Sequence, residues 1–161
     1  MQRQNLEKIV VATGVGKLRQ RPDFENNILP VIERELTAIT GQKPSQRTAR
    51  KSIAGFKIRE GEVVGLKVTL RGKRMSDFLK RFIEVVIPRI RDFHGISPKN
   101  IDEGGNLTMG VREHIVFPEV NPDEVKFDFG LEITLVPSVR DKDRDKNYDF
   151  YKSLGVPLEK K

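Results

Sequence analysis

Between residues 65 and 71 the chain alternates between apolar and polar side chains, and this pattern constrains the fold more than any other. The apolar positions are Leu66, Val68 and Leu70, and the polar positions are Lys67, Thr69 and Arg71. Successive side chains of a strand point to opposite faces, so the alternation is typical of a sheet with one buried and one solvated side. The segment therefore predicts a strand whose outward face is polar and cationic.

An amphipathic helix is predicted directly after this strand, from Lys73 to Ile87. Its apolar side chains recur three and four residues apart, at Met75, Phe78, Leu79, Phe82, Ile83 and Val86. Another helix is predicted from Pro22 to Thr40, because apolar residues again follow helical spacing: Phe24, Ile28, Ile32, Leu36 and Ile39. Pro30 either kinks this helix or stands in the first turn of its longer half.

The remaining segments complete the pattern of an α+β fold. Short strands are predicted at residues 8–13, within 44–71 around a mobile loop, at 106–111 and at 130–136. A short amphipathic helix is predicted around Tyr148, Tyr151 and Leu154 in the charged tail. This order favours a mostly antiparallel sheet with helices packed on one face. The length suits a single domain, residues 1–161.

Positive charge is concentrated in one part of the chain, which carries +7 overall. Residues 1–91 hold 20 Lys and Arg against 9 Asp and Glu, whereas residues 92–161 hold 10 against 14. No acidic residue lies between Glu35 and Glu60. That window holds six cations without a local partner: Lys43, Arg47, Arg50, Lys51, Lys57 and Arg59. A concentrated excess of this kind indicates a polyanionic partner.

The 43–59 window is interpreted as an RNA-binding segment. Its cations are interleaved with hydrogen-bonding side chains, namely Gln42, Ser45, Gln46, Thr48 and Ser52. Such a mixture suits phosphate and ribose contacts, although a merely solvated charge run is the alternative. The helix at 73–87 is also basic, but its four-residue pairs predict a self-neutralised surface: Lys73 with Asp77, Asp77 with Arg81, and Lys80 with Glu84.

Two further features of the basic region have opposing interpretations. Phe56 is either a core residue, which its residue type favours, or an aromatic platform for an unstacked base. Lys67, Thr69 and Arg71 project from one face of their strand, as the open face of an RNA-binding sheet requires.

Patterns of enzymes and metal proteins fail at specific positions. Gly14-Val15-Gly16-Lys17 lacks the flanking residues of a Walker loop, and Arg19 stands where a dinucleotide fingerprint needs its third glycine. Asp141, Asp143 and Asp145 resemble a calcium loop that continues with lysines instead of Gly and Glu. His94 and His114 are interpreted as surface or loop residues. We therefore expect no enzyme activity, no metal, no cofactor and no small-molecule substrate.

No segment has the length or apolarity of a signal peptide or a membrane span, so no membrane partner is expected. The chain also has no cysteine, which removes disulfides and thiolate metal sites from consideration.

Six ordered blocks resemble the family of bacterial large-subunit ribosomal protein five, the 5S rRNA-binding protein of the central protuberance. The blocks run from about residue 7 to 136: Glu7-Lys8-Ile9 with Gly14-Val15-Gly16; Gly41-Gln42-Lys43-Pro44; Ala49-Arg50-Lys51-Ser52 with Ala54-Gly55-Phe56-Lys57-Ile58-Arg59; Gly65 with Lys67-Val68-Thr69-Leu70-Arg71-Gly72; Pro88-Arg89-Ile90-Arg91-Asp92-Phe93; and Met109-Gly110-Val111-Arg112-Glu113 with Phe117-Pro118-Glu119.

The resemblance implies a cytoplasmic, ribosome-bound protein whose open sheet face binds 5S rRNA. By position, it implies RNA contacts at Lys8, Gln42, Phe56 and Thr69. With the cations above, the predicted rRNA-binding residues are Lys8, Thr13, Gln42, Lys43, Arg47, Arg50, Lys51, Phe56, Lys67, Thr69 and Arg71. Implied partners are 5S rRNA, 23S rRNA, neighbouring large-subunit proteins, peptidyl-site (P-site) tRNA and a small-subunit head protein.

Two further surfaces follow from the same resemblance. The 52–64 loop is expected to contact P-site tRNA, through Ser52, Gly55, Phe56, Lys57 and Arg59. The 106–119 region is expected to form an intersubunit bridge, through Asn106, Met109, Arg112 and Glu113. An RNA chaperone or regulator that uses the same basic face outside the ribosome is the alternative function.

The chain departs from the family pattern at two places. Ala12 stands where the family has Asn, so that polar contact is expected to be missing or moved to Thr13. The family also carries a helix of about two dozen residues before the first strand, and this sequence begins almost at the strand.

Overall fold

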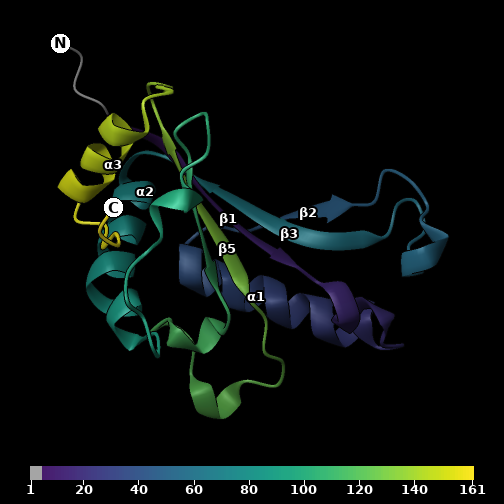
Figure 1. The fold of residues 1–161 in the computed structure, drawn as a ribbon. Helices are drawn as coiled ribbons and strands as arrows, with labels where there is room; N and C mark the ends of the chain where they lie inside the picture. The colour runs from purple at the N-terminus through teal and green to yellow at the C-terminus, as the bar shows by residue number, and fades with distance from the viewer. Residues whose placement is uncertain (1–4) are drawn as a thin grey trace.

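A five-stranded antiparallel sheet forms the centre of the structure, a computed structural model that describes residues 5–161 (Figure 1). The strands are β1 (Leu6–Gly14), β2 (Ser45–Thr48), β3 (Val63–Leu70), β4 (Leu107–Val111) and β5 (Leu131–Pro137). Their order in the sheet is β2-β3-β1-β5-β4, so the strand nearest the amino terminus lies in the middle. Each predicted strand is present, and the predicted α+β fold is confirmed.

Within the described residues, three α-helices accompany the sheet: α1 (Leu29–Thr40), α2 (Gly72–Arg81) and α3 (Arg144–Ser153). A π-helical turn at Phe24–Ile28 leads into α1, and Pro30 stands in the first turn of α1, which resolves the two interpretations of that proline. The helix ends as predicted at Gly41, whose φ of 76° is the left-handed conformation that glycine adopts most easily. A second π-helical turn, Phe82–Val86, continues α2.

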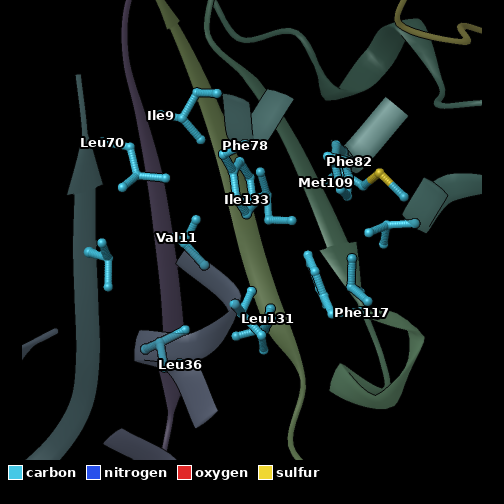
Figure 2. Packing of buried hydrophobic residues seen from close by; sticks show 14 of the residues in the cluster. Ile9, Val11, Leu36, Leu70, Phe78, Phe82, Met109, Phe117, Leu131 and Ile133 are labelled. Atoms are coloured by element: carbon cyan, nitrogen blue, oxygen red, sulfur yellow. The ribbon is translucent and has the colours of Figure 1, made fainter. Parts of the chain in front are cut away.

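One face of the sheet is buried by α1 and α2. Every second residue of each long strand points to this face, as Ile9 and Val11 of β1 and Ile133 of β5 do in Figure 2. The same view shows Leu36 of α1 and Phe78 of α2 packed among them. The alternation predicted from β3 alone therefore holds across the sheet, and the buried side is one continuous apolar cluster. The prediction of a single domain stays a prediction.

The surface of α2 differs from its expected form. Within residues 5–161, no ion pair joins Lys73 to Asp77, Asp77 to Arg81, or Lys80 to Glu84. Arg81 pairs instead with Glu119 from a distant loop. No local pair neutralises this helix, so that prediction was wrong; within residues 5–161, Arg81 alone of these residues is paired, with a partner that the tertiary fold supplies.

His114 was expected at the surface or in a loop; it lies in the short helical turn His114–Val116 between β4 and β5, but its side chain is fully buried. Its Nε2 lies 2.7 Å from Glu35 Oε2 of α1, and its Nδ1 lies 3.1 Å from Asp128 Oδ1. The imidazole stacks on Phe129, with the ring centroids 3.9 Å apart. Two carboxylates beside one imidazole thus join α1 to the loop that precedes β5.

The charged tail folds as predicted into a short helix, α3. Asp143 caps its first turn by accepting hydrogen bonds from the backbone N–H groups of Asp145 and Lys146. Tyr151 of this helix reaches the sheet, where its hydroxyl lies 2.6 Å from Gly105 O and 3.1 Å from Leu135 O. Of the three aspartates that resembled a calcium loop, Asp143 therefore caps the amino-terminal end of α3.

Candidate nucleic-acid interface

In the described part of the chain, α1 and α2 cover one face of the sheet, and the opposite face is called the open face. Strand register defines it, because directly paired residues point to the same side. Its residues include Lys8, Val10 and Ala12 of β1, Ser45 and Arg47 of β2, Lys67 and Thr69 of β3, Thr108 of β4, and Glu132 and Thr134 of β5. Most of these side chains are half-buried or exposed, as a surface available to a partner must be.

Unpaired positive charge marks one side of the open face. Lys67 lies opposite Ala12 of β1 and Ser45 of β2, and Arg47 follows on β2. Arg71 is exposed just after β3, in extended backbone. In the part of the chain that the structure describes, no ion pair involves Lys8 or any of these cations. Their charge is therefore available to phosphate groups.

The side of the open face formed by β4 and β5 was not predicted to belong to the RNA-binding surface. Thr134 of β5 lies opposite Val10, and its hydroxyl is 3.2 Å from that of Thr108 on β4. Glu132 is exposed beside them. The alternation in residues 130–136 indicated that every second side chain of β5 points away from the core. The strand register that places Thr134 opposite Val10 of β1 is not visible in the sequence.

Thr13 points to the opposite face from the predicted one. Its side chain is only 6% exposed, and its hydroxyl donates a 2.7 Å hydrogen bond to Gly130 O. Ala12 occupies the outward position instead. The polar contact expected here is therefore not transferred to Thr13, and we exclude Thr13 from the candidate interface.

Gln42 supports the edge of the sheet next to this surface. Its Nε2 donates to Thr69 O across 3.1 Å, at a point on β3 that β2 does not reach. Arg74 in turn donates to Gln42 Oε1 across 3.3 Å. The neighbouring Lys43 is exposed and has no ion-pair partner within the described residues. Gln42 thus fixes the edge beside Thr69, while Lys43 adds charge.

Residues 49–62 form a hairpin-like projection, called the arm below. Figure 1 shows it extending beyond the ends of β2 and β3, at the opposite end of the sheet from α2. Backbone hydrogen bonds join its two sides, Ala49 with Glu62 and Ile53 with Ile58. Arg50, Lys51, Ser52, Gly55, Lys57 and Arg59 are all exposed on it.

Phe56 stands at the tip of the arm, in the short helical turn Ala54–Phe56. Its ring is 69% exposed, so the burial that its residue type favoured was wrong. Ile53 is exposed beside it at 46%. Exposed apolar side chains among cations suit stacking against unpaired bases. The structure therefore excludes Phe56 as a core residue, and its role as an aromatic platform for a base stays a prediction.

Arg19 is a residue of the arm region that no sequence pattern singled out as an RNA-site residue. It lies in the helical turn Gly16–Gln20 after β1 and contacts the arm across a long sequence separation. Its guanidinium donates to the backbone oxygens of Phe56 and Lys57 and pairs with Glu62. No local motif marks such a residue, because its partners lie nearly 40 residues away.

The expected bridge residues are divided between surface and interior. Arg112 and Glu113 are exposed at the end of β4, whereas Met109 is buried on the helix-covered face. Asn106 donates through Nδ2 to Asp102 Oδ2 across 2.9 Å. Although partial burial opposes it, hydrogen bonds from Asn106 and Gly104 hold the pKa of Asp102 below its ordinary value. Only Arg112 and Glu113 of the four expected residues therefore offer fully exposed side chains to a partner.

Residues 5–161 include no helix that is long and apolar enough to cross a membrane. The same residues bring together no group of His, Cys, Asp or Glu side chains suited to holding a metal ion.

Comparisons with known proteins agree along almost the whole chain. The family described as ribosomal protein L5 matches residues 1–59, and the family that describes the C-terminus of ribosomal L5 proteins matches residues 63–158. A large ribosomal subunit protein uL5 of Halothermothrix orenii is 46% identical over 153 residues, which are 95% of this chain and 82% of that protein. Its counterpart from Colwellia psychrerythraea is 47% identical over 161 residues, 100% of this chain and 86% of that protein.

Proposed function

The chain belongs to the ribosomal protein L5 family, and from this membership we propose that it binds 5S rRNA and anchors it in the central protuberance. Membership makes it a non-enzymatic, ribosome-bound protein of the large subunit in the cytoplasm, with rRNA and ribosomal components as partners. The proposal specifies 5S rRNA as the bound RNA and the open face with the arm as the surface that binds this RNA.

One observation carries the proposal: the unpaired cations of the open face lead directly to those of the arm. On β3, Thr69 and Lys67 point outward, Arg71 follows directly after the strand, and the arm joins the other end of the strand at Val63. Eight residues of strand span roughly 26 Å, so a folded RNA can contact the strand and the arm together. Phosphates would bind the cations, and hydroxyl groups such as that of Thr69 would set the register.

We propose two further contacts for other parts of the same surface. Exposed residues of the arm, including Lys57 and Arg59, would contact the P-site tRNA. Arg112 and Glu113 would contact a small-subunit head protein at an intersubunit bridge. Both assignments follow the family resemblance, and exposure of these four side chains supports them. Contacts to 23S rRNA and neighbouring large-subunit proteins would complete the set.

Competition binding tests the central proposal. The protein would be titrated into labelled 5S rRNA at physiological salt, in the presence of an excess of an unrelated hairpin RNA of similar length. We expect the 5S rRNA complex to persist with a dissociation constant at least roughly 1,000 times lower than that of the hairpin, as in specific nucleic-acid complexes. Equal affinity for the two RNAs would contradict specific 5S binding and would favour a general RNA chaperone.

A further inference from the structure

We propose that Arg19 is a positioning residue for RNA binding, which holds the tip of the arm in the orientation that presents Phe56. The effect of Arg19 on RNA binding rests on the proposed function, because it requires that the arm be part of the RNA-binding surface. The bracing itself follows from contacts within the protein alone and can be tested without RNA.

The contacts place one guanidinium on three groups of the arm. Nη2 of Arg19 donates to Phe56 O across 2.7 Å, and Nη1 donates to Lys57 O across 3.0 Å. Nη1 also lies 3.2 Å from Glu62 Oε2, at the base of the arm. The Arg19 side chain is only 10% exposed, although its two backbone acceptors lie on the exposed arm. Hydrogen bonds from charged donors are stronger than neutral ones.

The arm needs this support because it has almost no apolar interior. Of residues 49–62, only Ala49, Ile58 and Glu62 are even partly buried. A few hydrogen bonds join its sides: Ala49 bonds to Glu62 and Gly61, Ile53 bonds to Ile58, and the Glu60 N–H donates to Ser52 Oγ. Isolated two-stranded hairpins are marginal in water. Additional contacts from the body of the protein therefore decide how well the tip is ordered.

Glu62 couples the base of the arm to its tip through the same guanidinium. Its Oε2 accepts from the backbone N–H of Arg59, at 3.2 Å, as well as facing Arg19. Arg19 itself is fixed by its own helical turn, in which its backbone N–H donates to Val15 O. The brace thus runs from the end of β1 to the tip and to the base of the arm.

The geometry requires arginine rather than any cation. A guanidinium presents several N–H groups in a rigid plane, whereas a lysine ammonium is a single point of donation. The two backbone oxygens belong to successive residues, Phe56 and Lys57, and each is reached by a different nitrogen of Arg19. Lysine would keep the charge near Glu62 but lose at least one of these bonds.

A groove lies between the brace and the tip and has a volume of about 450 Å³. Gly16 and Arg19 line one wall, and Gly55, Phe56 and Ile58 line the other. Phe56 thus borders this groove, although the residue is 69% exposed. Loss of the brace would let the tip move relative to the sheet, and the two halves of the RNA surface would no longer be held at a fixed separation.

The test compares Arg19→Lys with Arg34→Lys, which makes the same change at an exposed position of α1. Amide hydrogen exchange would be followed by NMR on the full chain. We expect exchange at Ile53 and Ile58 to be about tenfold faster in Arg19→Lys, since the loss of one charge-assisted hydrogen bond has about this effect. Compared with the control, exchange in β1 and the unfolding midpoint should change by no more than the loss of this one bond allows. Unchanged exchange in the arm would overturn the brace.

Titration with 5S rRNA then tests the consequence. Arg19→Lys should bind about tenfold more weakly at an unchanged salt dependence, because no charge is lost. Phe56→Ala should weaken binding in the native background and have little further effect on Arg19→Lys, as coupled residues do in a double-mutant cycle. Faster arm exchange with undiminished affinity, or additive effects of the two changes, would overturn the positioning role.

Failure of the proposed function is distinguishable from failure of this inference. It would appear in the unaltered protein, as equal affinity for 5S rRNA and an unrelated hairpin. The exchange result for Arg19→Lys does not depend on that outcome.

Discussion

Lys67 lies on the open face between Ala12 and Ser45, where no carboxylate of the described residues forms an ion pair with it. Replacement by glutamine would remove one charge and keep a polar side chain of similar length on the strand. If Lys67 contacts a phosphate, the variant should lower the slope of log affinity against log salt by roughly 0.7 to 0.9, because one counterion-releasing contact is lost.

Gel-shift titrations of 5S rRNA at four salt concentrations would measure this slope. Lys152→Gln, an equal charge change on the exposed side of α3, is the matched control and should leave the slope unchanged. The same loss of slope in both variants would mean that net charge, rather than a contact at Lys67, controls binding.

Single residues were the hardest level to predict. Phe56 is exposed, although its residue type alone favoured burial, and His114 is buried, although it was expected at the surface or in a loop. Residue type gives an average preference for burial, but the actual environment depends on partners that are distant in sequence. His114 is buried because Glu35 and Asp128, 79 residues before it and 14 after it, meet its two ring nitrogens.

At the level of elements, β1 and β3 pack closely where Gly65 of β3 faces the backbone of β1. Gly14 and Gly65 are directly paired, yet their surroundings differ. A methyl group added at Gly65 would lie 2.9 Å from Thr13 O, whereas one added at Gly14 would meet nothing within 4 Å. The obstructing atom is backbone in the middle of a sheet, so it cannot move aside without disturbing the register.

Gly65→Ala should therefore lower the free energy of unfolding by about 1 to 3 kcal/mol, the usual effect of overpacking. Gly14→Ala should change it by less than about 0.5 kcal/mol. Urea denaturation of both variants would measure the difference. A Gly65 variant as stable as the Gly14 variant would show that the sheet adjusts to the added methyl group.

Helices and strands were predictable because their patterns are local. The alternation in β3 and the helical spacing in α1 and α2 can each be seen within about fifteen residues. The order of strands in the sheet and the ion pair between Arg81 and Glu119 were not predictable, since both depend on register and on distant segments. The brace from Arg19 to the arm belongs to the same class. Most of the fold was thus available from the sequence, and fewer of the contacts at the candidate site were.

Across the whole molecule, Tyr151 connects the carboxy-terminal helix to the sheet. Its hydroxyl faces the backbone oxygens of Gly105 and Leu135, which come from separate segments, and the residue is fully buried. Burial raises the pKa of Tyr151 above its ordinary value. The neutral phenol therefore favours folding at neutral pH, and this contribution decreases as the pH rises above about 10.

Tyr151→Phe should lower the free energy of unfolding by about 1 to 3 kcal/mol, since two buried carbonyl groups lose their donor. Tyr148→Phe is the matched control, because that hydroxyl donates only to Glu159 O near the chain end, at 3.1 Å. Chemical denaturation at about pH 7 and about pH 10.5, on either side of the ordinary tyrosine pKa, would measure both. The difference between native protein and Tyr151→Phe should shrink at the higher pH; an equal difference at both values would contradict the role of the neutral phenol.

The central place of β1 has a consequence for biosynthesis. Ala12 pairs with Lys67 on one side and with Glu132 on the other, so the first strand made needs a neighbour that is made 120 residues later. At ordinary translation speeds, that interval is roughly 6 to 24 seconds. Throughout it, one edge of the nascent strand offers unpaired backbone groups to other chains. Release from the synthesising ribosome before β5 emerges would leave an incomplete sheet in which one edge of β1 is free to pair with strands of other chains.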